Sequence, residues 1–155
     1  MEIERKFLIG GWPEGLPLLR EAAVEQGYLS VKPAVRIRHA AENGTDEYWL
    51  TVKGKGTLAR EEIELPLSAG QYETMAAMLS KPLIKKQFRV YRLGEHRLEC
   101  NLVDEGKPTA FFYAEVEFPT VEAAERFVPP AFLGRDVTEE KGYAMADYWE
   151  RSDRG

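Results

Sequence analysis

The first eight residues, Met1-Glu2-Ile3-Glu4-Arg5-Lys6-Phe7-Leu8, decide the fold of this chain. Successive side chains of a β-strand point to opposite faces, so Glu2, Glu4 and Lys6 share one face. Ile3 and Phe7 share the other. Neighbouring positions on one face lie roughly 6.5–7 Å apart, so the two carboxylates repel each other unless a cation lies near them. The strand is therefore predicted to have one ionised face and one apolar face.

The same alternation recurs in later segments of the chain. Glu-x-Glu appears twice more, as Glu62-Ile63-Glu64 and Glu115-Val116-Glu117, and cations occur in matching phase at Arg36, Arg38 and Lys53. An antiparallel sheet with one solvated face explains any single strand of this kind. Doubled charges of one sign on strand after strand favour a different solution, a sheet closed into a barrel whose interior is charged.

Length and composition limit the class of protein. A chain of 155 residues that is 44% hydrophobic fits one domain, residues 1–155, with a core that needs no metal or disulfide. Cys100 is the only cysteine, which favours a reducing, cytoplasmic location. No apolar run approaches the roughly 18–20 residues of a membrane span, and we expect no signal peptide. The net charge of −5 argues against nucleic-acid binding.

Helices are predicted on the flanks of the strands, which makes the fold class α+β. Ser68-Ala69-Gly70-Gln71 has the Ser-x-x-Gln form of a capping box, and helical spacing follows it as far as Pro82. Thr120 is a second candidate cap, for a helix over residues 121–127. The tail over residues 138–151 is also predicted to be helical.

A charged interior of both signs indicates phosphoryl chemistry. Lysine and arginine make charge-assisted hydrogen bonds to phosphate oxygens. Clustered carboxylates suit Mg²⁺ or Mn²⁺, hard ions that prefer oxygen ligands. Together, a metal and several cations stabilise the charge that develops as a phosphoanhydride bond breaks, and they can orient an attacking water.

The opening stretch resembles the N-terminal Glu-x-Glu-x-Lys signature of the CYTH superfamily, also called triphosphate tunnel metalloenzymes. The resemblance continues in order along almost the whole chain. Its further blocks are Gln26-Gly27-Tyr28-Leu29, Val35-Arg36-Ile37-Arg38, Thr51-Val52-Lys53-Gly54, Glu62-Ile63-Glu64, Ala114-Glu115-Val116-Glu117 and Asp136-Val137-Thr138. It implies an eight-stranded antiparallel β-barrel with flanking helices, which binds a linear triphosphate in its tunnel.

The resemblance also implies a set of site residues. The phosphate-binding set is Lys6, Arg36, Arg38, Lys53, Lys86 and Arg89. The set that holds one or two Mg²⁺ or Mn²⁺ ions, directly or through water, is Glu2, Glu4, Glu62, Glu64, Asp104, Glu115 and Glu117. Catalytic roles fall on Lys6, Tyr28 and Lys53, of which Tyr28 and Lys53 match a pair thought to assist hydrolysis and to select tripolyphosphate in some members.

Two places depart from the family pattern. The family often has Lys-x-Arg in its middle strand, whereas this chain has Lys85-Lys86-Gln87-Phe88-Arg89. We assign Lys86 and Arg89 to the tunnel, with Lys85 as the alternative lysine, although strict alternation cannot place both on one face without a bulge. The family's following aspartate fits Asp104 or, as a changed residue, Asn101.

The leading functional prediction is a metal-dependent triphosphatase that acts on inorganic tripolyphosphate or a related small-molecule triphosphate. The first alternative is a class IV adenylate cyclase, which uses the same tunnel with a 3′-hydroxyl as the nucleophile. The second is a non-catalytic module that binds polyphosphate or a nucleotide. A homodimer is a further possibility, and the residues do not settle the oligomeric state.

Overall fold

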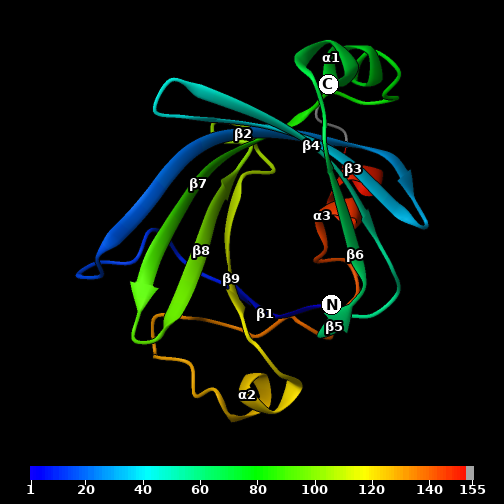
Figure 1. Ribbon diagram of the computed structural model, residues 1–155. Helices are drawn as coiled ribbons and strands as arrows, with labels where there is room; N and C mark the ends of the chain where they lie inside the picture. The colour runs from blue at the N-terminus through cyan, green and yellow to red at the C-terminus, as the bar shows by residue number, and fades with distance from the viewer. Residues whose placement is uncertain (153–155) are drawn as a thin grey trace.

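The computed structural model describes residues 1–152, and its centre is one antiparallel sheet that curls into a barrel (Figure 1). The strands are β1 (Glu2–Leu8), β2 (Leu18–Val31), β3 (Ala34–Glu42), β4 (Thr45–Lys53), β5 (Ala59–Arg60), β6 (Glu62–Pro66), β7 (Ile84–Leu93), β8 (His96–Val103) and β9 (Phe111–Glu117). Their order in the sheet is β5-β1-β9-β8-β7-β2-β3-β4-β6. The predicted antiparallel barrel is confirmed.

The sheet has nine strands where eight were predicted. The extra strand arises because Glu61 interrupts the ladder between β5 and β6. Arg60 of β5 pairs with Glu2 of β1, and Glu62 of β6 pairs with Lys53 of β4. One continuous segment therefore joins the two ends of the sheet and closes the barrel.

The free edge of β1 beyond β5 is covered by residues 134–138. The N–H of Leu8 donates to the carbonyl of Arg135 at 2.9 Å, and the N–H of Val137 donates to the carbonyl of Lys6 at 2.9 Å. Arg5, on the outer face of β1, forms an ion pair with Asp136 at 2.8 Å. Both edges of the strand that carries the Glu-x-Glu-x-Lys motif are thus hydrogen-bonded, which fixes the direction of its side chains.

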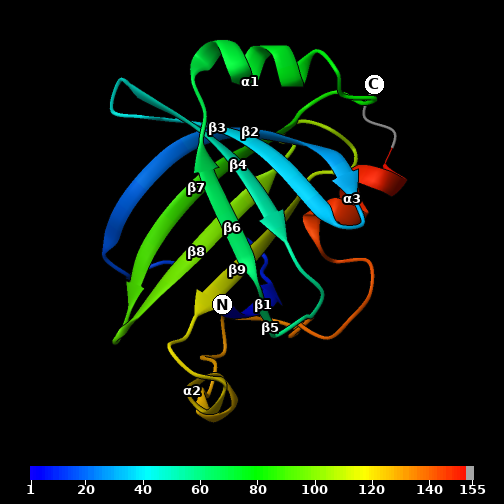
Figure 2. The same cartoon turned by 45° about the vertical axis from the view of Figure 1, so that its right-hand side comes forward.

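Two apolar clusters flank the tunnel. The first lies outside the barrel wall under α2 (Val121–Arg126) and includes Phe7, Ala114 and Val116, the outward residues of β1 and β9. The second lies at one end of the barrel, where α3 (Met145–Arg151) buries Tyr148 and Trp149 against Tyr28 and other lining residues. Figure 2 shows α3 at this end and α2 on the opposite side of β1. Helix α3 therefore packs over one end of the tunnel.

The helix predictions are confirmed at two places and wrong at one. Ser68 caps α1 (Ala69–Ala76) with the predicted capping box, although the helix ends before the predicted stop at Pro82, and the Thr120 side chain caps α2. The tail is helical only from Met145, because Thr138 is held against β1, where its hydroxyl oxygen accepts from the N–H of Lys6 at 2.9 Å. Among the described residues, no helix is long and apolar enough to cross a membrane.

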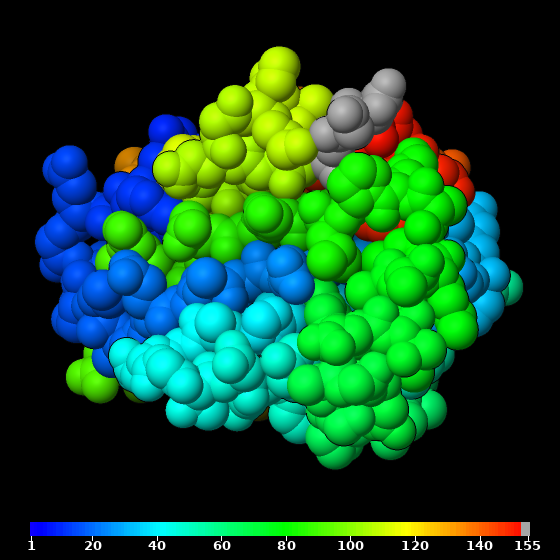
Figure 3. All heavy atoms as spheres, turned by 90° about the horizontal axis from the view of Figure 1, so that it is seen from above, coloured from blue at the N-terminus to red at the C-terminus, as the bar shows by residue number. Residues whose placement is uncertain are grey.

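Helix α1 docks on the outer face of β3 and β4 through a small polar and aromatic cluster. The ring of His39 stacks on Tyr48 at 4.6 Å, and the hydroxyl of Tyr72 on α1 donates to Glu25 at 3.1 Å. The two ring nitrogens of His39 lie 3.4 Å from Glu25 and 2.8 Å from Asp46. Figure 3 shows this side of the molecule, with the green α1 segment beside the cyan β3–β4 hairpin.

The His39 cluster predicts a pH dependence of stability. Partial burial lowers the pKa of His39, but the carboxylates of Asp46 and Glu25 outweigh it, so the pKa is raised above 6.5. The stabilisation is therefore fully present below about pH 6.5 and is lost as the pH rises through the folded-state pKa. His39 is partly buried, and we expect these contacts to contribute about 0.5 kcal/mol to the free energy of unfolding, or about 1–2 °C in Tm. Thermal unfolding measured from pH 5.5 to 8.5 gives the dependence of Tm on pH. In the His39→Gln variant, the fall of Tm with rising pH should become smaller. If the fall is unchanged, His39 is not the group responsible.

Candidate active site

The register of the strands defines which side chains line the tunnel. Glu4 lies opposite Glu117, and Lys6 lies opposite Glu115, so the charged residues of β1 and β9 face the same way. Arg36 lies opposite Tyr28 and Thr51, and the other lining positions follow by alternation. The predicted inward set of β1, β3, β4 and β9 thus faces one interior.

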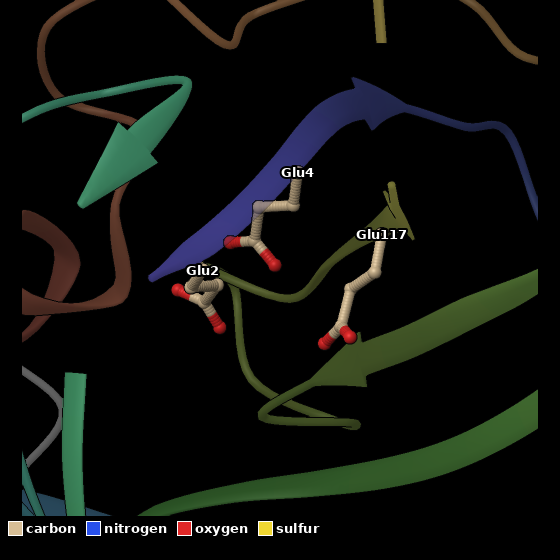
Figure 4. Close-up of side chains that lie close together, drawn as sticks. All are labelled: Glu2, Glu4 and Glu117. Atoms are coloured by element: carbon tan, nitrogen blue, oxygen red, sulfur yellow. The ribbon is translucent and has the colours of Figure 1, made fainter. Parts of the chain in front are cut away.

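Three carboxylates converge at the start of β1. One oxygen each from Glu2, Glu4 and Glu117 lies within 4.8 Å of the others, and Figure 4 shows the three side chains pointing toward one another. Burial, together with neighbouring carboxylates, raises the pKa of Glu2 and raises that of Glu4 well above its usual value. Such a set of oxygen donors fits a hard divalent cation, because a cation there would remove the repulsion among the carboxylates.

Glu115 connects this carboxylate group to the phosphate-side cations. Burial alone would raise its pKa, but Lys6, a hydrogen bond with Glu4 and the charges of Lys53 and Lys86 together lower it. The ammonium of Lys6 lies 3.6 Å from the Glu115 carboxylate and donates to the carbonyl of Tyr143 at 3.1 Å. Glu4 and Glu115 therefore titrate as a coupled pair, in which the pKa of Glu4 is raised and the pKa of Glu115 is lowered.

Three further cations line the part of the tunnel wall formed by β3 and β7, and this part is called the cationic roof below. Arg36 donates to the hydroxyl of Thr51 at 3.3 Å, and Arg38 donates to the side-chain oxygen of Gln26 at 3.1 Å. Lys86 is 4% exposed and donates to the hydroxyl of Tyr113 at 3.0 Å. Burial and the nearby Arg38 lower its pKa well below the usual value. Because these cations repel one another, an anion between them would relieve the strain of holding them together.

Lys53 lies between two predicted metal-side carboxylates. Its ammonium is 3.0 Å from Glu2 and 3.5 Å from Glu62. Tyr28, the proposed catalytic partner of Lys53, lines the same interior cavity of about 50 Å³ and packs against Trp149 at 6.1 Å. The structure thus brings Tyr28 and Lys53 to one cavity. Glu64 is on the lining face opposite Thr51, but its side chain is exposed.

Two predicted residues do not join the site. Arg89 lies on the outer face of the barrel, over the ring of Trp12 at 4.1 Å and 2.8 Å from Glu21. Strand β7 pairs with β8 without a bulge, so Arg89, three positions after the inward Lys86, points outward.

Asp104 follows the end of β8, where it accepts from the hydroxyl of Tyr148 at 2.6 Å and from the N–H of Lys85 at 3.0 Å. It therefore holds α3 against the barrel and lies apart from the carboxylate group.

Two charged lining residues were missed. Arg60 lies opposite Glu2, with its Nε 3.7 Å from the Glu2 carboxylate. Glu99 lies opposite Glu115, and burial with the charges of Glu115 and Glu117 raises its pKa to about 7. The lining position two residues after Lys86, where the family pattern has arginine, is Phe88, and its partner on β8 is Asn101.

Comparisons with known proteins agree with this geometry. The chain is 33% identical over 142 residues to an inorganic triphosphatase of Nitrosomonas europaea, and the match covers 92% of each protein. This chain belongs to the CYTH superfamily. The CYTH chain also superimposes on the crystal structure of the inorganic triphosphatase NE1496 with a TM-score of 0.68, 29% identity, and coverage of 100% of this chain and 97% of the other. No family model matches the sequence.

A more distant structure shares only the fold of this CYTH chain. It is a candidate adenylyl cyclase from Hippeastrum with a dominant triphosphatase activity, and it superimposes with a TM-score of 0.56 at 15% identity. The match covers 81% of this chain and 83% of that protein. At 15% identity, this likeness supports only the shared barrel fold.

Proposed function

We propose that this chain hydrolyses inorganic tripolyphosphate to diphosphate and orthophosphate, with Mg²⁺ or Mn²⁺ as cofactor. The observation that carries the proposal is the division of one tunnel into a carboxylate wall on β1 and β9 and a cationic roof on β3 and β7. The similarity to an inorganic triphosphatase over 92% of the chain supports it. The lone Cys100, which is buried, supports a cytoplasmic location.

Each wall has a separate task in this proposal. Lys6, Arg36, Arg38 and Lys86 bind the phosphate oxygens and hold the linear anion in line for attack. The residues that would hold the metal are Glu2, Glu4 and Glu117, with Glu62 and Glu115 beside them. When bound, the metal would offset phosphate charge and lower the pKa of an attacking water.

Lys53 and Tyr28 complete the site. Lys53 contacts Glu2 and Glu62 and also lines one cavity with Arg36 and Arg38, so it lies where the metal side and the phosphate side of the tunnel meet. There its positive charge can stabilise the leaving phosphate oxygens, and the hydroxyl of Tyr28 can donate to an oxygen of the same group.

Phosphate release tests the proposal directly. We expect purified protein to release orthophosphate from tripolyphosphate when Mg²⁺ or Mn²⁺ is added, and we expect EDTA to stop the reaction. Binding of tripolyphosphate by calorimetry without any release would instead identify a non-catalytic module. Formation of cyclic AMP and diphosphate from ATP would identify the cyclase.

A further inference from the structure

Gln26 is a fully buried amide on β2, the strand that lies between the two strands of the cationic roof. Its exposed fraction is 0%, and it pairs across the sheet with Arg38 on β3. Tyr28, two positions later on β2, shares its lining face. A buried amide is costly unless both its carbonyl oxygen and its NH₂ group have partners. The partners of Gln26 therefore indicate what this residue does in the tunnel.

The chemistry of Arg38 fixes the direction in which the Gln26 amide points. A guanidinium has five N–H donors and no acceptor, so the amide atom that faces it has to be the carbonyl oxygen. Arg38 donates to Gln26 Oε1 from Nη2 at 3.1 Å and from Nε at 3.3 Å. The NH₂ group of Gln26 is thereby turned to the other side, where its Nε2 donates to the hydroxyl oxygen of Tyr28 at 3.3 Å.

This hydrogen bond determines what the Tyr28 hydroxyl can still do. A phenol has a single O–H donor, and an amide NH₂ group cannot accept a hydrogen bond, so the proton of Tyr28 has to point away from Gln26. Among residues 1–152, the hydroxyl makes no other hydrogen bond. Tyr28 lines the interior cavity together with Arg36, Arg38 and Lys53. Its O–H is therefore left to donate to an acceptor in that cavity, and phosphate oxygens are acceptors.

Close packing holds the backbone between Gln26 and Tyr28. A Cβ atom on Gly27 would lie 2.4 Å from a side-chain atom of Leu79 and 3.2 Å from one of Trp149. The lack of a side chain at Gly27 thus allows α3 to approach the strand closely. Trp149 packs against the ring of Tyr28, with the ring centroids 6.1 Å apart. This packing fixes the place of the Tyr28 ring, and the hydrogen bond from Gln26 sets the direction of its proton.

We propose that Gln26 is a positioning residue that holds Arg38 with its carbonyl oxygen and directs the hydroxyl proton of Tyr28 toward the bound triphosphate with its NH₂ group. This inference rests on the proposed triphosphatase function and deepens it by assigning the orientation of two groups that contact the substrate. Gln26→Glu would reverse the second hydrogen bond, because a carboxylate accepts from Arg38 and also accepts from the O–H of Tyr28.

A double-mutant cycle on phosphate release from tripolyphosphate with Mg²⁺ tests the effect on Tyr28. The quantity measured is the tyrosine factor, defined as kcat/KM of a chain with Tyr28 divided by kcat/KM of the same chain carrying Tyr28→Phe. We expect a tyrosine factor of about 10 or more in the wild-type background, as for a hydrogen bond to a charged acceptor. In Gln26→Glu it should be less than about 2, because the O–H is turned to the new carboxylate. Gln26→Met, which has no donor for the hydroxyl oxygen, should give an intermediate value.

Binding of tripolyphosphate in EDTA tests the effect on Arg38 without turnover. Gln26→Met removes the acceptor that holds the guanidinium, so calorimetry should give a Kd about 3–10-fold higher than that of wild type, equivalent to one hydrogen bond. The same increase should remain when Tyr28→Phe is present in both chains, because it acts through Arg38. An unchanged Kd would contradict the role of Gln26 in holding Arg38.

Gln87→Glu is the matched control, because it makes the same chemical change at an exposed position on the outer face of β7. It should leave the tyrosine factor at the wild-type value, and thermal unfolding checks that each variant is folded. A purely structural role for Gln26 predicts lower activity with the same tyrosine factor in both Gln26 variants, and that result would overturn the inference. A wild-type tyrosine factor near 1 would overturn it too. Absence of phosphate release by the wild-type protein would instead refute the proposed function.

Discussion

Lys6→Ala should lower kcat/KM for tripolyphosphate by about 10²–10³-fold, comparable to removing a preorganised donor from other active sites. The lysine is the cation nearest to Glu115, at 3.6 Å, and it shares the tunnel with Lys86 and Arg38. Its removal takes away a phosphate ligand. It also leaves Glu115 beside Glu4 with less cationic support, so the pKa of Glu115 should rise.

The measurement is phosphate release in the presence of Mg²⁺, with thermal unfolding to confirm that the variant is folded. Lys85→Ala is the matched control, because Lys85 is exposed on the outward face of the same tunnel wall that holds Lys86. We expect that control to change kcat/KM less than about twofold, as for a surface position away from any buried feature. Retention of more than about a third of wild-type kcat/KM by Lys6→Ala would contradict a phosphate-binding role.

Much of the site was predictable because the side-chain direction of a strand depends only on local alternation. Glu2, Glu4 and Lys6 were assigned to one face from their spacing, and the structure places them there. Closure of the barrel was less predictable, since it depends on pairing between β1 and β5, two strands far apart in sequence. Arg60 was missed for that reason: its strand has two residues and no repeat to recognise.

The errors and omissions in the middle of the sheet have a common cause. Arg89 was assigned inward from the resemblance to the family's Lys-x-Arg pattern, against the alternation rule, and the unbroken register between β7 and β8 shows that the rule holds. Glu99 is a single acid between Leu98 and Cys100, so it lacks the Glu-x-Glu pattern that marked the other carboxylates. The role of Asp104 depends on contact with Tyr148, 44 residues later, which no local pattern reveals.

Glu4→Gln should have opposite effects on activity and on the stability of the metal-free protein. Glu4 is 8% exposed, and its oxygens lie within 4.8 Å of those of Glu2 and Glu117. Replacing a buried, repelling carboxylate with a neutral amide of the same shape should raise the metal-free Tm by about 2–4 °C, equivalent to about 1 kcal/mol. The same change removes a charge that a divalent cation needs, so we expect kcat/KM to fall by about 10²-fold or more.

Metal-dependent stabilisation separates these two effects without relying on turnover. A ligand that binds only the folded state raises its stability by about 2.7 kcal/mol at a concentration of 100 Kd, so Mn²⁺ should raise the wild-type Tm by several degrees. For Glu4→Gln we expect a much smaller rise at the same Mn²⁺ concentration. Glu64→Gln is the comparison variant, because Glu64 is an exposed carboxylate on the same lining face, outside the group of three. If Mn²⁺ stabilises Glu4→Gln as much as wild type, then the three carboxylates at the start of β1 do not hold the metal, and their repulsion must serve another purpose.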